Sequence, residues 1–227
     1  MEPNPIILRS VVEAMSITVR DVLADFNASI SSVNHNGLYQ AVWARRGQVV
    51  TNMLADNETI KVVHVHHKSI WQFEAIVDTD QRDAYLLMSH DNLKALQKKF
   101  KKQSSSHHHY LYSFLCLNPK PTSTQQSLFQ SDENEEAARK SDCDIMLGEF
   151  ANQIDRVYVV AFDYAENTAT GGAIYLLDQN GTTIETKDIS DMLLDQEETS
   201  ENDSLGTDPI KHSSKPTPLV KLKIKKA

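Results

Sequence analysis

The sequence IKVVHV at residues 60–65 is followed by WQFEAIV at residues 71–77 and by AYLLM at residues 84–88. Apolar side chains occupy every second position of the second segment, which is the period of a strand with one buried face. The polar residues 78–83 between the last two segments are typical of a turn. These segments therefore predict an antiparallel meander of three strands.

Helical periodicity precedes the meander. Apolar residues recur at steps of three and four from Leu8 to Phe26, which predicts one helix with a single buried face. A second helix is predicted at about residues 38–54, after the polar residues 29–37. The short connection suggests an antiparallel helical pair, which we expect to pack on the meander.

The second half of the chain mixes both periods. We expect a helix beginning near Asp91, where the aspartate can cap it, and a longer helix at about residues 132–154. A strongly apolar strand is predicted at residues 156–163. Asn180-Gly181 is a strong turn signal and predicts a hairpin. The fold class is therefore α+β, and the pattern leaves open whether the later strands complete the first sheet or form a second one.

Composition divides the chain into four parts. Residues 1–118 hold the helical pair, the meander and the basic helix, and residues 119–131, rich in Pro, Ser, Thr and Gln, form a linker or long loop. Residues 132–195 are expected to complete the same domain. Residues 196–227 are charged and nearly free of apolar side chains, so this tail is expected to be disordered.

Charge and cysteine content exclude several classes of protein. The net charge of −8 over 227 residues excludes a nucleic-acid footprint covering the whole surface, although a local basic patch is compatible with it. Cys116 and Cys143 are too few for a disulfide scaffold, and we expect buried free thiols. The sequence lacks the pattern of a signal peptide and has no apolar run of membrane-spanning length, so we expect neither a leader nor a membrane span. The sequence predicts a cytoplasmic protein without membrane contact.

Histidine is unevenly distributed, because seven of the nine histidines lie between His64 and His109. Residues two apart on a strand share a face, so His64 and His66 could bind one divalent metal together with Glu74 or Asp78. Such a site would suit metal-assisted hydrolysis. The pattern equally describes the solvent face of an amphipathic strand, and this alternative is favoured. No other cofactor is expected.

A local basic patch is the second candidate site. Lysines and neighbouring aromatic residues can bind single-stranded nucleic acid. Lysines at the C-terminal end of a helix also complement its dipole without binding anything, which is the favoured alternative. The candidate nucleic-acid-binding residues are Arg45, Arg46, Lys94, Lys98, Lys99, Lys101 and Lys102.

The end of the tail alternates apolar and basic residues between Leu219 and Lys226. A segment with this pattern can add itself as a strand to the sheet edge of a protein partner. Its partner-binding residues would be Leu219, Val220, Leu222 and Ile224. The alternative is a solubilising tail with no fixed partner.

No complete catalytic constellation is visible. The chain lacks a Gly-x-Ser-x-Gly motif, and Gly171-Gly172 is not part of a strand–loop–helix phosphate motif. The sequence therefore assigns no catalytic residue.

One family resemblance rests on the order of elements in the first 120 residues and on the strand pair after Arg156. Trp71-Gln72-Phe73 and residues 85–89 precede a helix that ends in Lys98-Lys99-Phe100, and residues 109–112 precede Asn118-Pro119. This order resembles an uncharacterised family of bacterial proteins associated with mobile elements and with toxin–antitoxin or phage-defence loci. The resemblance implies a role in such a system and carries over no catalytic residues.

Two hypotheses follow. The first is a non-enzymatic interaction protein of a bacterial toxin–antitoxin or defence system, which docks onto a protein partner through its helical pair or its tail. The second is a toxin or effector that acts on nucleic acid, for example as a metal-dependent nuclease using His64 and His66. Docking is slightly favoured over catalysis.

Overall fold

The computed structural model describes residues 2–67, 71–101, 109–121, 133–165 and 168–193. Lys102 and the predicted tail segment 219–226 lie outside these ranges. The fold is α+β. Its elements are α1 (Pro5–Ser16), α2 (Val19–Ser29), α3 (Leu38–Leu54), β1 (Ile60–His67), β2 (Trp71–Asp78), β3 (Asp83–Ser89), α4 (His90–Lys101), α5 (Tyr110–Phe114), η2 (Leu115–Leu117), α6 (Glu133–Leu147), η3 (Gly148–Phe150), β4 (Arg156–Ala165), β5 (Thr168–Leu177) and β6 (Thr183–Asp188).

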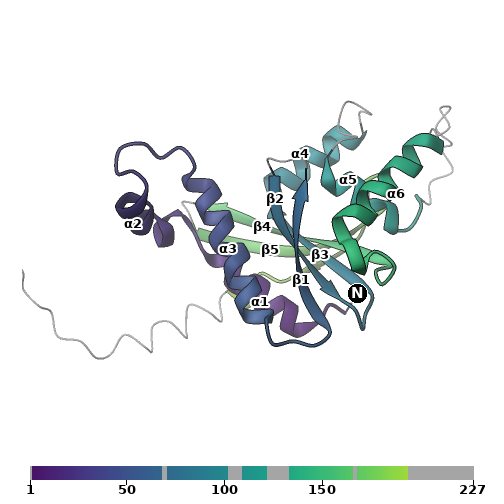
Figure 1. Cartoon of the computed structure of the whole chain (residues 1–227), viewed down its shortest axis with the longest axis horizontal. Coiled ribbons are helices and arrows are strands. Elements are labelled where there is room, and N and C mark those ends of the chain that lie inside the picture. Colours follow the sequence, from purple (N-terminus) through teal and green to yellow (C-terminus); the bar gives the residue numbers. More distant parts are fainter. Residues whose placement is uncertain (1, 68–70, 102–108, 122–132, 166–167, 194–227) are drawn as a thin grey trace, which may run out of the picture.

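The six strands of the described residues form one sheet in the order β1-β2-β3-β4-β5-β6, which answers the question that the sequence left open. The predicted meander β1–β3 and the hairpin β5–β6 are both antiparallel. However, β3 and β4 are parallel neighbours, so the sheet is mixed rather than antiparallel. A parallel pair needs a crossover connection, and α4, α5 and α6 lie in that connection (Figure 1).

The prediction of one helix from Leu8 to Phe26 is wrong, because the chain breaks between α1 and α2. Ile17 is extended, and the backbone N–H and the hydroxyl of Thr18 donate hydrogen bonds of 2.7 and 2.9 Å to the Asp21 carboxylate. This is the reciprocal half of a capping box, which starts a new helix without interrupting the apolar spacing. Periodicity alone therefore could not detect the break.

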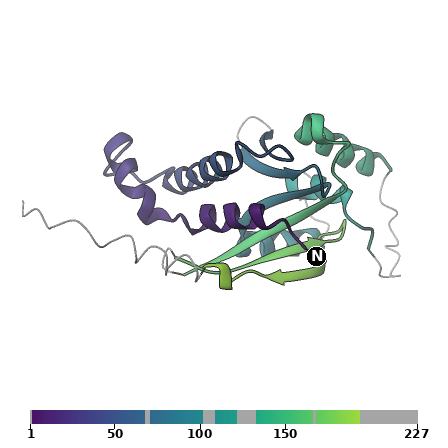
Figure 2. The same ribbon diagram turned by 90° about the horizontal axis from the view of Figure 1, so that it is seen from below.

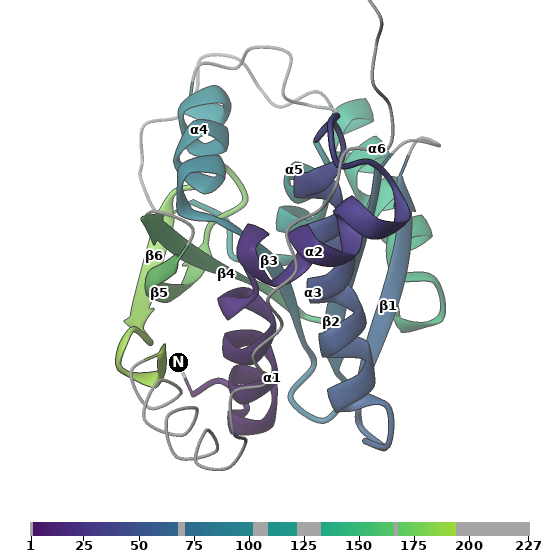
Figure 3. The ribbon, with the colours of Figure 1, turned by 90° about the vertical axis from the view of Figure 1, so that its left-hand side faces the viewer.

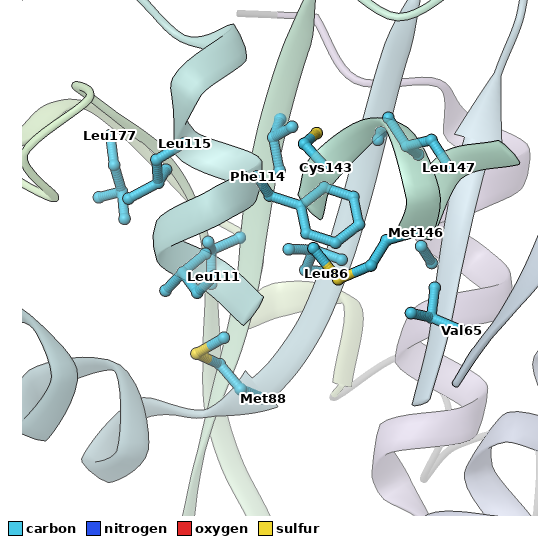
Figure 4. Packing of buried hydrophobic residues seen from close by; sticks show 14 of the residues in the cluster. Val65, Leu86, Met88, Leu111, Phe114, Leu115, Cys143, Met146, Leu147 and Leu177 are labelled. Atoms are coloured by element: carbon cyan, nitrogen blue, oxygen red, sulfur yellow. The ribbon is translucent and has the colours of Figure 1, made fainter. Parts of the chain in front are cut away.

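Each face of the sheet has its own core. Residues of α1 and α3 pack on one face with Ile76, Tyr85 and Val160. The other face packs with α4, α5 and α6. Figure 4 shows the second core, in which Phe114 lies near Leu86 of the sheet and near Cys143 and Met146 of α6. Within the described ranges, no helix is both long and apolar enough to cross a membrane.

A third, small core lies away from the sheet. Val22 and Phe26 of α2 pack against Leu38 and Val42 of α3. Figures 1 and 2 show α2 projecting at one end of the molecule, with α3 between it and the strands. We call residues 18–46 the helical arm.

Arg46 fixes the base of the arm. Its Nε and Nη2 donate hydrogen bonds of 3.0 and 2.7 Å to the carbonyl oxygen of Ile17, where α1 and α2 meet. The guanidinium also lies 4.7 and 4.8 Å from the ring centres of Trp43 and Tyr164. Burial lowers the pKa of Arg46, yet the side chain stays charged because an arginine titrates far above neutral pH.

Replacing Arg46 by methionine is expected to lower the free energy of unfolding by about 2 kcal/mol, because a charged donor pair is lost and the Ile17 carbonyl is left without it. Denaturant titration measures this loss, and hydrogen exchange should accelerate within residues 18–46. The control is Arg45→Met, since Arg45 is exposed one position earlier. Equal stability of the two variants would contradict this role.

Candidate functional site

The site lies where β3 ends beside the last residues of its parallel neighbour β4. Their register pairs Ser89 with Phe162, so the next residues, His90 and Asp163, come side by side. His90 is also the first residue of α4, which turns the chain away from the sheet. The carboxyl ends of adjacent parallel strands are a common place for binding and catalytic groups in sheets covered by helices.

His90 joins two other side chains by hydrogen bonds. Its Nδ1 lies 2.9 Å from Oδ2 of Asp163, and its Nε2 lies 3.1 Å from the hydroxyl of Tyr175 on β5. An ionised carboxylate only accepts hydrogen bonds, so Nδ1 carries a proton and, in the neutral ring, Nε2 accepts from Tyr175. This series, Asp163–His90–Tyr175, is called the relay below.

The electrostatics of the relay keep Tyr175 protonated. Burial raises the pKa of the Tyr175 hydroxyl, and the negative charges of Asp163 and Asp188 raise it further. A free phenolate is therefore disfavoured at neutral pH. The hydroxyl can become nucleophilic only if its proton moves to a base, and His90 Nε2 is in the right position.

Small residues form the sheet surface beneath the relay. Asp163 pairs with Gly171 and Ala161 pairs with Ala173, on the face from which Tyr175 projects. A Cβ atom at Gly171 would lie 3.3 Å from the Ser190 hydroxyl oxygen and 3.8 Å from Oδ2 of Asp163. The first distance is tight and the second is an ordinary contact, so an alanine here would press on Ser190 and would only touch Asp163.

The basic helix leads directly away from the relay. His90, Lys94 and Lys98 follow one another at steps of four, so they share one side of α4. Gln97 fixes the helix against the β5–β6 hairpin through hydrogen bonds to Gly181 O (2.9 Å) and to the Thr183 hydroxyl (3.1 Å). Figure 3 shows α4 beside β4, β5 and β6.

The lysines of α4 are exposed. Within the part of the chain that the structure describes, none of them lies within ion-pair distance of a carboxylate. Their positive charge is thus available to a ligand.

The structure divides the predicted nucleic-acid patch. Lys94, Lys98, Lys99 and Lys101 lie on α4, against one face of the sheet, whereas α3 packs on the opposite face. Arg46 is only 6 % exposed and is committed to the Ile17 carbonyl. Including Arg46 in a phosphate-binding patch was therefore wrong, and Arg45 belongs to a different surface.

The predicted metal ligands are only partly brought together. His64 faces Glu74 across β1 and β2, with Nδ1 and Oε1 3.7 Å apart, and His66 lies two residues further on. Asp78 pairs with Ile60, about 13 Å along β2 from Glu74. It accepts a hydrogen bond from Asn4 and is buried, so it is not a fourth ligand. No three His, Cys, Asp or Glu side chains of the described residues cluster as a metal site.

The sequence did not reveal the relay. His90 was counted among the clustered histidines but had no assigned role, and nothing in the spacing linked it to Asp163 or Tyr175, which lie 73 and 85 residues away. One signal was present, because both His90 and Asp163 stand at the ends of predicted strands. This signal could be interpreted only with the knowledge that the two strands are parallel neighbours in the sheet.

Comparison with known proteins gives a family and nothing more. A family model described as "Family of unknown function (DUF5986)" matches residues 4–227. No curated protein and no solved structure matches the chain. Since the match covers nearly the whole sequence, the chain belongs to the DUF5986 family.

Proposed function

We propose that this protein is an enzyme that cleaves phosphodiester bonds of nucleic acid, with Tyr175 as the nucleophile and His90 as its base. The observation that carries the proposal is the pair of hydrogen bonds that places His90 between Asp163 and Tyr175. A nucleophile and a base within hydrogen-bond reach, with the base oriented by a third group, is the diagnostic arrangement of covalent catalysis.

The chemistry follows from the roles of the three residues. The Tyr175 oxygen attacks phosphorus while its proton passes to His90 Nε2, and Asp163 stabilises the imidazolium that forms. The imidazolium then protonates the departing sugar oxygen, which leaves a phosphotyrosyl ester. Water hydrolyses this ester with His90 again as base, and Tyr175 recovers its hydroxyl. The step consumes one water molecule and needs no redox partner.

The lysines of α4 favour a phosphate-rich polymer as substrate. Lys94 and Lys98 extend from His90 along the same side of the helix, so a strand lying on them would bring a phosphate to the relay. Each lysine that neutralises a phosphate adds sequence-independent affinity that weakens with salt. We therefore expect cleavage with little sequence preference and with strong salt dependence.

A cleavage assay tests this proposal. End-labelled single-stranded RNA and an equivalent DNA are each incubated with purified full-length protein, with and without a chelator. The proposal expects cleavage of at least one substrate, undiminished by chelation. Cleavage that requires a divalent metal would instead favour the site predicted at His64 and His66. Absence of cleavage of both substrates at every salt concentration would overturn the proposal.

A second function, docking onto a protein partner, is favoured by the surface of the helical arm. Half of the large, exposed apolar side chains in the described ranges fall between residues 30 and 43. Tyr39 is 70 % exposed, and Ile30 and Val33 in the preceding loop are 68 % and 91 % exposed. Apolar side chains gathered on a projecting element are typical of an interaction surface, so we propose that the arm binds an apolar surface of another protein.

Replacing both Ile30 and Tyr39 by serine is expected to weaken partner binding by at least about 30-fold, the effect of losing roughly 2 kcal/mol of central apolar contact. Affinity purification identifies the partner, and calorimetry with the purified partner measures the loss. Ile184→Ser is the control, because Ile184 is similarly exposed on β6. Equal binding by both variants would contradict docking through the arm.

Three further expectations from the sequence stay predictions. These are docking through the tail, cytoplasmic localisation, and a role in a toxin–antitoxin or defence locus. Deleting residues 210–227 tests the first, because the bound partner should be lost while the folded part is unchanged.

A further inference from the structure

The two cysteines of the chain lie together in the structure. Cys116 belongs to η2 and Cys143 to α6, and Cys116 packs against the core cluster that contains Cys143. Both are free. Cys143 is fully buried, as expected from the sequence, whereas Cys116 is partly exposed. Residues 27 positions apart thus bring one partly exposed and one buried cysteine into the same core.

A cavity of about 160 Å³ opens onto Cys116. Arg139 is held at its wall, with Nη2 donating hydrogen bonds of 2.8 Å to the carbonyl oxygens of both Tyr112 and Gln179. Lys140 lies beside it and pairs with Asp144. The residues lining the cavity are Cys116, Lys120, Glu136, Arg139, Lys140 and Gln179. A small polar molecule in this cavity would therefore lie beside Cys116, among three cationic side chains and one carboxylate.

The surroundings make the two thiols unequal. The interaction with the Cys143 side chain lowers the pKa of Cys116, burial opposes this, and the charges of Arg139 and Lys140 lower it further. The same interaction and burial raise the pKa of Cys143. Cys116 thus ionises first, and a thiolate, rather than a thiol, reacts with oxidants.

We propose that Cys116 and Cys143 form a reversible intramolecular disulfide on exposure to peroxide. The Cys116 thiolate attacks one peroxide oxygen of hydrogen peroxide, which breaks the O–O bond and gives a sulfenic acid and hydroxide. The Cys143 sulfur then attacks the Cys116 sulfur and displaces the sulfenic oxygen as water. The peroxide gains two electrons, the two thiols lose them, and a dithiol reductant reverses the bond.

The bond would join η2 to α6, two elements that already pack in the same core. Because η2 and α6 are already neighbours in that core, oxidation should add a covalent link without a change of fold. The relay of His90, Asp163 and Tyr175 holds no cysteine, and the inference is independent of the proposed function.

The experiment uses the full-length protein, titrated with hydrogen peroxide. Free thiols are counted with a thiol reagent, and unreduced peptides are identified by mass spectrometry. We expect loss of both thiols together, a cross-linked peptide containing Cys116 and Cys143, and recovery with dithiothreitol. Oxidation that yields only intermolecular disulfides, or no loss of thiols in excess peroxide, would overturn the proposal.

Single variants separate the two roles. In Cys143→Ala, the sulfenic acid at Cys116 should persist and be captured by dimedone. In Cys116→Ala, the buried Cys143 should resist peroxide at concentrations that oxidise the wild type. Reaction of Cys143 at the wild-type rate in this variant would contradict the order of attack.

A second pair of variants tests the charge of the cavity. Lys140→Met should slow the oxidation of Cys116, whereas Lys99→Met on α4 should not. Equal oxidation rates in the two variants would contradict the role of the cationic cavity.

Discussion

Replacing Tyr175 by phenylalanine is expected to lower the rate of phosphodiester cleavage by roughly 10³-fold or more, since removal of a nucleophile or its base costs at least that much in catalytic triads. The substitution deletes only the hydroxyl that reaches His90 Nε2 and retains the ring that packs beside it. The free energy of unfolding should therefore change little. Initial rates on the end-labelled substrate measure the effect.

The control for this variant is Tyr39→Phe, which removes a hydroxyl from a highly exposed tyrosine of the helical arm. Its cleavage rate should equal that of the wild type. Asp163→Asn should also impair cleavage, because an amide can donate to Nδ1 and so favour the wrong tautomer of His90. Full activity of Tyr175→Phe would exclude Tyr175 as the nucleophile.

The largest expected loss of stability follows from Asn118→Ala. Asn118 is 3 % exposed, and its Nδ2 donates hydrogen bonds of 2.9 and 2.8 Å to the carbonyl oxygens of Val157 and Leu177. Its Oδ1 accepts one of 2.7 Å from the Val157 N–H. In the variant, these buried backbone groups lose their hydrogen-bond partner, which should lower the free energy of unfolding by about 3 kcal/mol or more.

Denaturant titration tests this expectation, with Asn152→Ala as the control because Asn152 is exposed. The control should unfold within about 0.5 kcal/mol of the wild type, as ordinary surface substitutions do. A loss below about 1 kcal/mol for Asn118→Ala would show that the side chain does not tie η2 to β4 and β5 as the hydrogen bonds indicate.

The strands of the meander could be predicted because alternation reports a buried face within a few residues. The turn signal at Asn180-Gly181 was equally local, and Gly181 has a positive φ of 79°, a conformation that glycine adopts readily. The parallel pairing of β3 with β4 could not be predicted, since their register joins residues about 73 apart through a helical crossover. No local pattern specifies which strands become neighbours across such a distance.

The same limit explains the candidate site. Clustering in sequence drew attention to His64 and His66, and their strand geometry was as expected. The sequence suggested that Arg46 is an exposed charge like its neighbour Arg45. In the structure, the helix breaks at Thr18, and the Ile17 carbonyl at this break accepts hydrogen bonds from Arg46. The relay depends entirely on the sheet order, because His90, Asp163 and Tyr175 come from three different strands or strand ends.

The most direct test of the account is to look for the covalent intermediate. Wild-type protein is incubated with labelled nucleic acid, denatured rapidly, digested, and analysed by mass spectrometry for nucleotide-modified peptides. We predict a phosphotyrosyl adduct on Tyr175 that is absent from Tyr175→Phe. Cleavage by the wild type that proceeds with no adduct on Tyr175, or with an adduct on another residue, would contradict it.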